Sequence, residues 1–202
     1  MNIAKSNMKT KRVFLGVSGL LITIVTAFSL HSSHAQNQNL NPHIIKVKPP
    51  ELVASDDDWI NTPENKPLKL ESRKGKVTIV HFWTFGCINC KRNLPVYTRW
   101  QKKYSKKDVV IIGVHTPETD DEKDPANVAK EVKRLKITYP VVIDGKNENW
   151  KNWQQNFWPT VYIIDKKGFV RAYWVGELDW EHAGGEAIMA RKIDALLKES
   201  GE

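Results

Sequence analysis

Two continuous apolar runs constrain the fold of this chain more than any other feature. They are KVTIVHFW at residues 76–83 and VVIIGV at residues 109–114. Runs of this kind are typical of strands that are covered on both faces of a sheet. Between them Tyr97, Trp100 and Tyr104 recur at intervals of three and four residues, which predicts a helix over about residues 90–104. Strand, helix and strand in this order indicate an α/β architecture.

The alternation of strands and helices continues to the end of the chain. Asp124 and Pro125 form a start signal for a helix, with the aspartate as N-cap and the proline in the first turn. The turn-forming residues 165–168 separate two apolar runs, which predicts a pair of antiparallel strands. We predict an α/β fold, a central mixed sheet with helices on both faces; the remaining predicted elements are a strand at 141–144, a helix at 149–155, strands at 159–164 and 169–176, and a helix at 186–198.

The N-terminal segment has the pattern of a secretory signal. Residues 1–12 carry four basic residues and no acid, residues 13–30 are uncharged, and Ser33 and Ala35 supply a small-residue cleavage site. We predict a signal peptide over residues 1–35, a linker over 36–50 and one domain over 51–202. An uncleaved N-terminal membrane anchor is the alternative, because a spanning helix needs about 20 residues. Both alternatives place the domain in the periplasm or elsewhere outside the cytoplasm.

The charge balance of the expected domain argues against a nucleic-acid partner. Residues after position 35 hold all 23 acidic residues and 27 of the 31 basic residues, so their net charge is near +4. That value is ordinary for a soluble surface and supplies no strong basic patch for nucleic acid.

The only two cysteines, Cys87 and Cys90, follow the first apolar run directly. Structural disulfides are common outside the cytoplasm, but a bridge across two residues closes too short a loop to stabilise a fold. A cysteine at a helix N-terminus has a lowered pKa and supplies a thiolate near neutral pH. We therefore predict that Cys87 is a nucleophile and Cys90 a resolving thiol. We expect no cofactor beyond a redox-active Cys87–Cys90 disulfide, and no zinc site.

Several short strings of this chain resemble the thioredoxin superfamily, and within it the extracytoplasmic TlpA/ResA-like group. The resemblance is strongest to the thioredoxin-like domain of DipZ-type proteins and spans residues 51–202. It implies a thioredoxin fold with an extra central β-α insertion at about residues 117–144. The strings are DWIN (58–61), GKV (75–77), FWTFGCINC (82–90), GVHTPE (113–118), DPANV (124–128), ITYPV (137–141) and WPT (158–160).

The resemblance also implies a substrate-binding site beside the cysteines. Pro159 matches the family's cis-proline, and the backbone of Trp158 is expected to pair with a substrate peptide. A proline that only begins a strand is the simpler alternative. Trp83 either packs beneath the site or contacts substrate with one edge.

The chain departs from the family where a buried acid is expected. His81 and Asn93 occupy the two positions at which family members carry that acid. His81 is a candidate proton relay, and a neutral, hydrogen-bonded histidine inside a strand is the alternative. Glu118 and Glu148 are further candidates. We expect the acidic run at residues 118–124 to be a solvated loop.

The function that the resemblance implies is an extracytoplasmic thiol–disulfide oxidoreductase that reduces secreted or periplasmic proteins through a mixed disulfide. The implied partners are protein thiols and disulfides, among them apocytochrome c during cytochrome c biogenesis, and a membrane electron donor of the CcdA/DsbD type. A copper-delivery module of the Sco type and a thiol peroxidase are the alternatives. Thr84 and Cys87 match half of a peroxiredoxin pattern, but Val80 stands where that pattern has proline.

Overall fold

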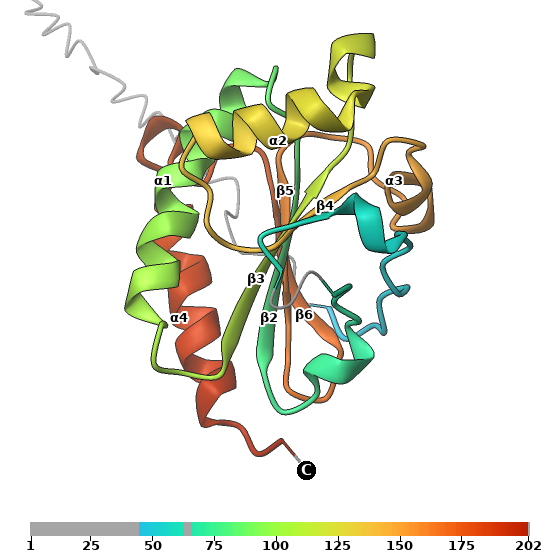
Figure 1. Cartoon of the computed structure of the whole chain (residues 1–202). Coiled ribbons are helices and arrows are strands. Elements are labelled where there is room, and N and C mark those ends of the chain that lie inside the picture. The colour runs from blue at the N-terminus through green and yellow to red at the C-terminus, as the bar shows by residue number, and fades with distance from the viewer. Residues whose placement is uncertain (1–44, 63–65, 202) are drawn as a thin grey trace, which may run out of the picture. The chain divides into compact units, whose positions relative to one another are not determined.

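The computed structural model describes residues 45–62 and 66–201 (Figure 1). Its strands form one six-stranded sheet in the order β1-β4-β3-β2-β5-β6. Strands β2, β3 and β4 are parallel, whereas β1, β5 and β6 run antiparallel to their neighbours. The predicted mixed sheet is therefore confirmed. The strands are β1 (Trp59–Ile60), β2 (Val77–Trp83), β3 (Val109–His115), β4 (Val141–Ile143), β5 (Thr160–Ile164) and β6 (Val170–Val175).

In the described residues four α-helices alternate with these strands, close to their predicted positions. They are α1 (Ile88–Lys103), α2 (Pro125–Arg134), α3 (Glu148–Asn152) and α4 (Gly185–Lys198). The start signal of α2 is confirmed, because the side chain of Asp124 accepts a hydrogen bond from the N–H of Ala126 at 2.9 Å. Helix α1 begins earlier than predicted, with Cys87 as its N-cap. Strand β1 was not predicted, because two residues are too few to show a period of two.

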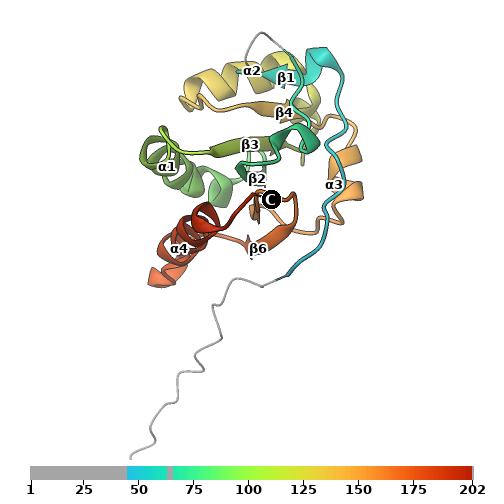
Figure 2. The same cartoon turned by 90° about the horizontal axis from the view of Figure 1, so that it is seen from below.

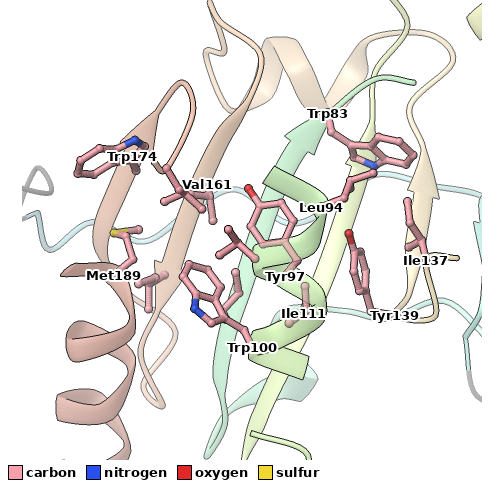
Figure 3. Close-up of a cluster of buried hydrophobic side chains, with 14 of the residues drawn as sticks. Trp83, Leu94, Tyr97, Trp100, Ile111, Ile137, Tyr139, Val161, Trp174 and Met189 are labelled. Atoms are coloured by element: carbon pink, nitrogen blue, oxygen red, sulfur yellow. The ribbon is translucent and has the colours of Figure 1, made fainter. Parts of the chain in front are cut away.

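Helices cover both faces of the sheet, as predicted (Figure 2). Helices α1, α2 and α4 pack on one face, where Tyr97, Trp100 and Met189 lie in a single apolar cluster (Figure 3). On the other face α3 and the segment before β2 pack on Phe82 and its neighbours. Strand β2 lies at the centre of the sheet, and all seven of its residues are buried. This burial explains why its sequence is a continuous apolar run.

The register of β2 determines which residues surround the cysteines. Trp83 at its C-terminal end pairs with His115 of β3, and Phe82 pairs with Thr160 of β5. The two cysteines, the loop after β3 and the residues before β5 therefore meet at one end of the sheet. Open α/β sheets bind ligands at the carboxyl ends of their parallel strands.

The predicted signal peptide or anchor lies outside the described residues, as does most of the predicted linker. The described end of the linker pairs with the domain. Val47 forms an isolated antiparallel bridge to Val170, whose N–H donates to the Val47 carbonyl at 2.8 Å. Within residues 45–62 and 66–201, no helix has the length and apolar character needed to span a bilayer.

Candidate active site

Cys87 stands at the N-terminus of α1, at the point where β2 has ended. As N-cap it has an extended backbone, with φ −70° and ψ 116°, and its Sγ accepts a hydrogen bond from the N–H of Cys90 at 3.3 Å. Cys87 is partly exposed, whereas Cys90 is 1% exposed. Both are free thiols in this structure. The sulfur of Cys87 thus takes the place of the side-chain oxygen that usually caps a helix.

The two sulfurs have opposite acidities. A hydrogen bond from the Cys90 thiol, together with the N–H groups of Cys90 and Asn89, lowers the pKa of Cys87 to about 6, although burial and the charge of Glu118 oppose this. Burial raises the pKa of Cys90 far above its ordinary value. At neutral pH this arrangement holds one thiolate that is accessible and one thiol that is not.

Pro159 follows a cis peptide bond to Trp158. Its carbonyl accepts a hydrogen bond from the N–H of Gly176, just after β6, at 2.7 Å. The antiparallel pairing of β5 with β2 brings this segment to the end of the sheet where the cysteines lie. The large side chains of Phe157 and Ile88 are 63% and 57% exposed, beside Trp158 and Cys87 respectively.

Asn93, one of the two positions where the family carries an acid, has a structural task. Its side chain is 2% exposed; it donates to the carbonyl of Gly176 at 3.1 Å and accepts from the N–H of Leu178 at 2.9 Å. Since Gly176 also bonds to Pro159, this amide connects α1 to the cis-proline. An ionised acid could not replace it, because a carboxylate accepts hydrogen bonds but does not donate them.

His81 is fully buried, and burial lowers its pKa to about 3. Its ring stacks on Tyr97, with centroids 4.1 Å apart, and meets the edge of Tyr139 at 5.4 Å. A histidine with this pKa is neutral at pH 7, as the second interpretation of His81 expects. That interpretation is wrong about hydrogen bonding, because neither ring nitrogen of His81 has a hydrogen-bond partner among the described residues. Trp83 is also buried and packs on His115, so it lies beneath the site and offers no edge to a substrate.

Two buried groups, Glu122 and His115, lie behind the loop before Cys87. The sequence predicted that His115 either lines the cleft or only shapes the loop that follows it, and it assigned no role to Glu122. The carboxylate of Glu122 accepts from the N–H of Gly86 at 2.6 Å, and His115 Nε2 lies 3.4 Å from the N–H donor of Phe85. The expectation of a solvated acidic loop is therefore wrong at Glu122, which is 1% exposed. The sequence signal that Glu122 is not solvated was its capping-box spacing from Thr119. This spacing predicts a helical turn in which the glutamate side chain accepts the backbone N–H of the N-cap residue.

The other candidate acids differ in their relation to the cysteines. Glu118 is exposed, and its charge acts on both Cys87 and Cys90. Glu148 is exposed at the start of α3. Within the part of the chain that the structure describes, no three His, Cys, Asp or Glu side chains are grouped so that they could hold a metal ion.

Comparison with known proteins identifies the family. The model of the AhpC/TSA family matches residues 46–173. The chain belongs to the AhpC/TSA family. The thioredoxin fold expected from the resemblance is also confirmed. A thioredoxin-like superfamily protein, SPOA0173, superposes with a TM-score of 0.66 at 23% identity, over 76% of this chain and 98% of that chain.

Two relatives of this family member are particularly informative. Protein DipZ of Mycobacterium tuberculosis is 44% identical over 122 residues, which are 60% of this chain and 18% of DipZ. The chain thus spans less than a fifth of DipZ. Thiol-disulfide oxidoreductase YkuV of Bacillus subtilis is 25% identical over 125 residues, 62% of this chain and 80% of YkuV. The resemblance to DipZ-type thioredoxin-like domains is confirmed.

Proposed function

We propose that this protein is an extracytoplasmic thiol–disulfide oxidoreductase in which Cys87 is the nucleophile and Cys90 the resolving thiol. The observation that carries the proposal is the geometry of the pair: a partly exposed Cys87 caps α1 with its sulfur, and Cys90 lies 1% exposed one turn inward. The name of YkuV, a thiol-disulfide oxidoreductase, supports the same reaction class. The location outside the cytoplasm rests on the signal-like pattern of residues 1–35.

The proposed direction is reduction of a substrate disulfide. The Cys87 thiolate attacks one substrate sulfur, so that a Cys87–substrate disulfide forms, the substrate S–S bond breaks, and the other substrate sulfur leaves as a thiolate that takes up a proton. Cys90 then loses its proton and attacks Cys87. A Cys87–Cys90 disulfide forms and the second substrate sulfur leaves as a thiol. Two electrons have passed from the protein to the substrate.

The second step needs Cys90 to ionise, although burial opposes this. Part of the rise in the pKa of Cys90 comes from the negative charge on Cys87 and from the hydrogen bond between the two side chains. The mixed disulfide removes both, because Cys87 is then neutral. Cys90 therefore becomes more acidic only after Cys87 has captured a substrate.

The substrate that we propose is a polypeptide. The family resemblance makes the backbone of Trp158 the candidate partner for an extended substrate segment. Two exposed side chains offer apolar contacts: Phe157, which precedes Trp158, and Ile88, which follows Cys87. Secreted or periplasmic proteins, including apocytochrome c, fit this class. Recharging the Cys87–Cys90 disulfide needs a two-electron donor, for which we propose a membrane carrier of the CcdA/DsbD type.

A trapping experiment in cells tests the proposal. Cys90→Ser should accumulate a mixed disulfide between Cys87 and its substrates, seen as complexes that reducing agent dissolves and that mass spectrometry identifies. The double variant Cys87→Ser/Cys90→Ser is the matched control and should trap nothing. Accumulation of complexes by Cys87→Ser, with none in Cys90→Ser, would reverse the assigned roles. Recovery of complexes from the cytoplasmic fraction alone would contradict the proposed location.

A further inference from the structure

A buried carboxylate lies directly behind the peptide that precedes Cys87. Glu122 is 1% exposed, and its Oε1 accepts the N–H of Gly86 at 2.6 Å. The contact leaves no space for a side chain, because a Cβ on Gly86 would lie 2.5 Å from that oxygen. In the described part of the chain Glu122 forms no salt bridge, so hydrogen bonds alone stabilise its charge.

The second oxygen of the same carboxylate joins another loop to the site. Oε2 accepts the N–H groups of Glu118 and Thr119 at 2.7 and 2.9 Å. Burial opposes the ionised form, but hydrogen bonds from the Thr84 hydroxyl and from these backbone groups lower the pKa of Glu122. Glu122 is thus ionised at neutral pH and ties the loop after β3 to the loop after β2.

Among the described residues, no other hydrogen bond supports the loop before Cys87 as strongly. His115 Nε2 meets the N–H of Phe85 at 3.4 Å, which is a long hydrogen bond, and its ring stacks on the Phe85 ring. The bond from Gly86 to Glu122 is shorter and engages a charged acceptor, so it is the stronger of the two. Gly86 is also one residue from Cys87, whose backbone angles place its sulfur over the N–H of Cys90.

We propose that Glu122 is a positioning residue that holds Gly86 and thereby keeps the sulfur of Cys87 in its helix-capping position. This role rests on the proposed function, in which Cys87 is the nucleophile. Two effects of Glu122 on Cys87 have opposite signs. Its charge disfavours the thiolate, whereas its hold on Gly86 favours the thiolate by keeping the N–H groups of α1 on the sulfur. We infer that the hydrogen bond to Gly86 affects the pKa of Cys87 more than the charge of Glu122 does, because that charge is spread over several hydrogen bonds.

Two variants separate these effects. Glu122→Gln removes the charge and places an amide N–H₂ group among N–H donors. Gly86→Ala keeps the charge and pushes the carboxylate away from the loop. The measurement is the pH dependence of Cys87 alkylation by iodoacetamide in the reduced protein, with the site confirmed by mass spectrometry. Asp121→Asn is the matched control, because Asp121 is the exposed neighbour of Glu122 on the same turn.

In both variants the midpoint of alkylation should rise by about one pH unit, and it should stay unchanged in Asp121→Asn. A lower midpoint in Glu122→Gln would show that the charge dominates, and would overturn the proposal. Unchanged midpoints in both variants, with only a reduced unfolding temperature, would show a purely structural role and would also overturn it. If Glu122→Gln does not fold, Gly86→Ala decides alone.

The alkylation readout does not depend on turnover of any disulfide. A normal Cys87 midpoint in the wild-type protein with no trapped substrate would contradict the proposed function and leave the positioning role intact. Trapped substrate, with an unshifted Cys87 alkylation midpoint in both Glu122→Gln and Gly86→Ala, would support the proposed function and contradict the positioning role.

Discussion

The rings of Trp150 and Trp158 stack face to face, with centroids 3.9 Å apart and planes inclined by 24°. Trp150 belongs to α3, and Trp158 precedes the cis-proline. The buried carboxylate of Asp144 holds the start of α3 in place, since it accepts the N–H of Trp150 at 2.9 Å and the hydroxyl of Thr116 at 3.0 Å. One side of the segment proposed to bind substrate is therefore set by an ordered aromatic pair.

Trp150→Ala should weaken substrate binding without changing Cys87. An aromatic pair of this kind contributes about 1 kcal/mol beyond the area it buries, so Trp158 and its backbone would be less well ordered. We expect KM for a disulfide-bonded protein substrate to rise several-fold, and the alkylation midpoint of Cys87 to stay the same. Steady-state kinetics and alkylation on one preparation check both. An altered midpoint with an unchanged KM would contradict the role given to this stack.

Asn93→Asp should destabilise the folded protein, although the two side chains have the same shape. The carboxylate would face the carbonyl of Gly176, which then loses its donor, and an unsatisfied buried group costs roughly 1–3 kcal/mol. Urea unfolding of the reduced protein measures the change. Asn152→Asp, at an exposed position on α3, is the control and should lose much less stability. Equal losses in the two variants would show that the Asn93 contacts contribute nothing specific.

Glu118→Gln should lower the pKa of Cys87. The charge of Glu118 raises the pKa of both cysteines, and Glu118 is exposed, so the effect should be modest and should shrink in high salt. Alkylation profiles at low and high ionic strength test this, with Asp121→Asn as the reference. A midpoint that rises on loss of Glu118 would mean that this residue supports the thiolate instead of opposing it.

Ionisation of Cys87 should make the stability of the reduced protein depend on pH. Folding lowers the pKa of Cys87 from 9.0 to about 6, which means that the folded state stabilises the thiolate over the thiol. The resulting stabilisation is complete above the unfolded value and is lost as pH falls towards 6. The free energy of unfolding of the wild type, relative to Cys87→Ser, should therefore decrease as pH falls from 9.0 to about 6, which are the limits of that window. A difference that is constant over this range would contradict the lowered pKa.

Periodicity and local signals in the sequence were sufficient for most of the fold. The continuous apolar runs gave β2 and β3, and Asp124 with Pro125 gave the start of α2, because these signals depend on neighbours in the chain. Strand β1 has only two residues and exists through its pairing with β4, so no local pattern predicts it.

Only part of the candidate site could be predicted from the sequence. The close spacing of Cys87 and Cys90 predicts the reactive pair, and the family resemblance predicts the role of Pro159. The sequence does not predict the contacts of Asn93 and Glu122 with distant backbone groups. Asn93 bonds to Gly176, 83 positions away, and Glu122 bonds to Gly86, 36 positions away. A run of acidic residues predicts a solvated segment, because acidic side chains are mostly exposed. Only the fold shows that one of them, Glu122, lies against a buried loop.

A pH titration of thiolate absorbance in the fully reduced protein, with Cys87→Ser and Cys90→Ser in parallel, tests the nucleophile assignment most directly. One thiol of the wild-type protein should ionise with a midpoint near pH 6, and this transition should be absent in Cys87→Ser. Cys90 should stay protonated throughout that range. A wild-type protein in which neither thiol ionises below about pH 8, close to the ordinary value for cysteine, would contradict the assignment of Cys87 as the nucleophile.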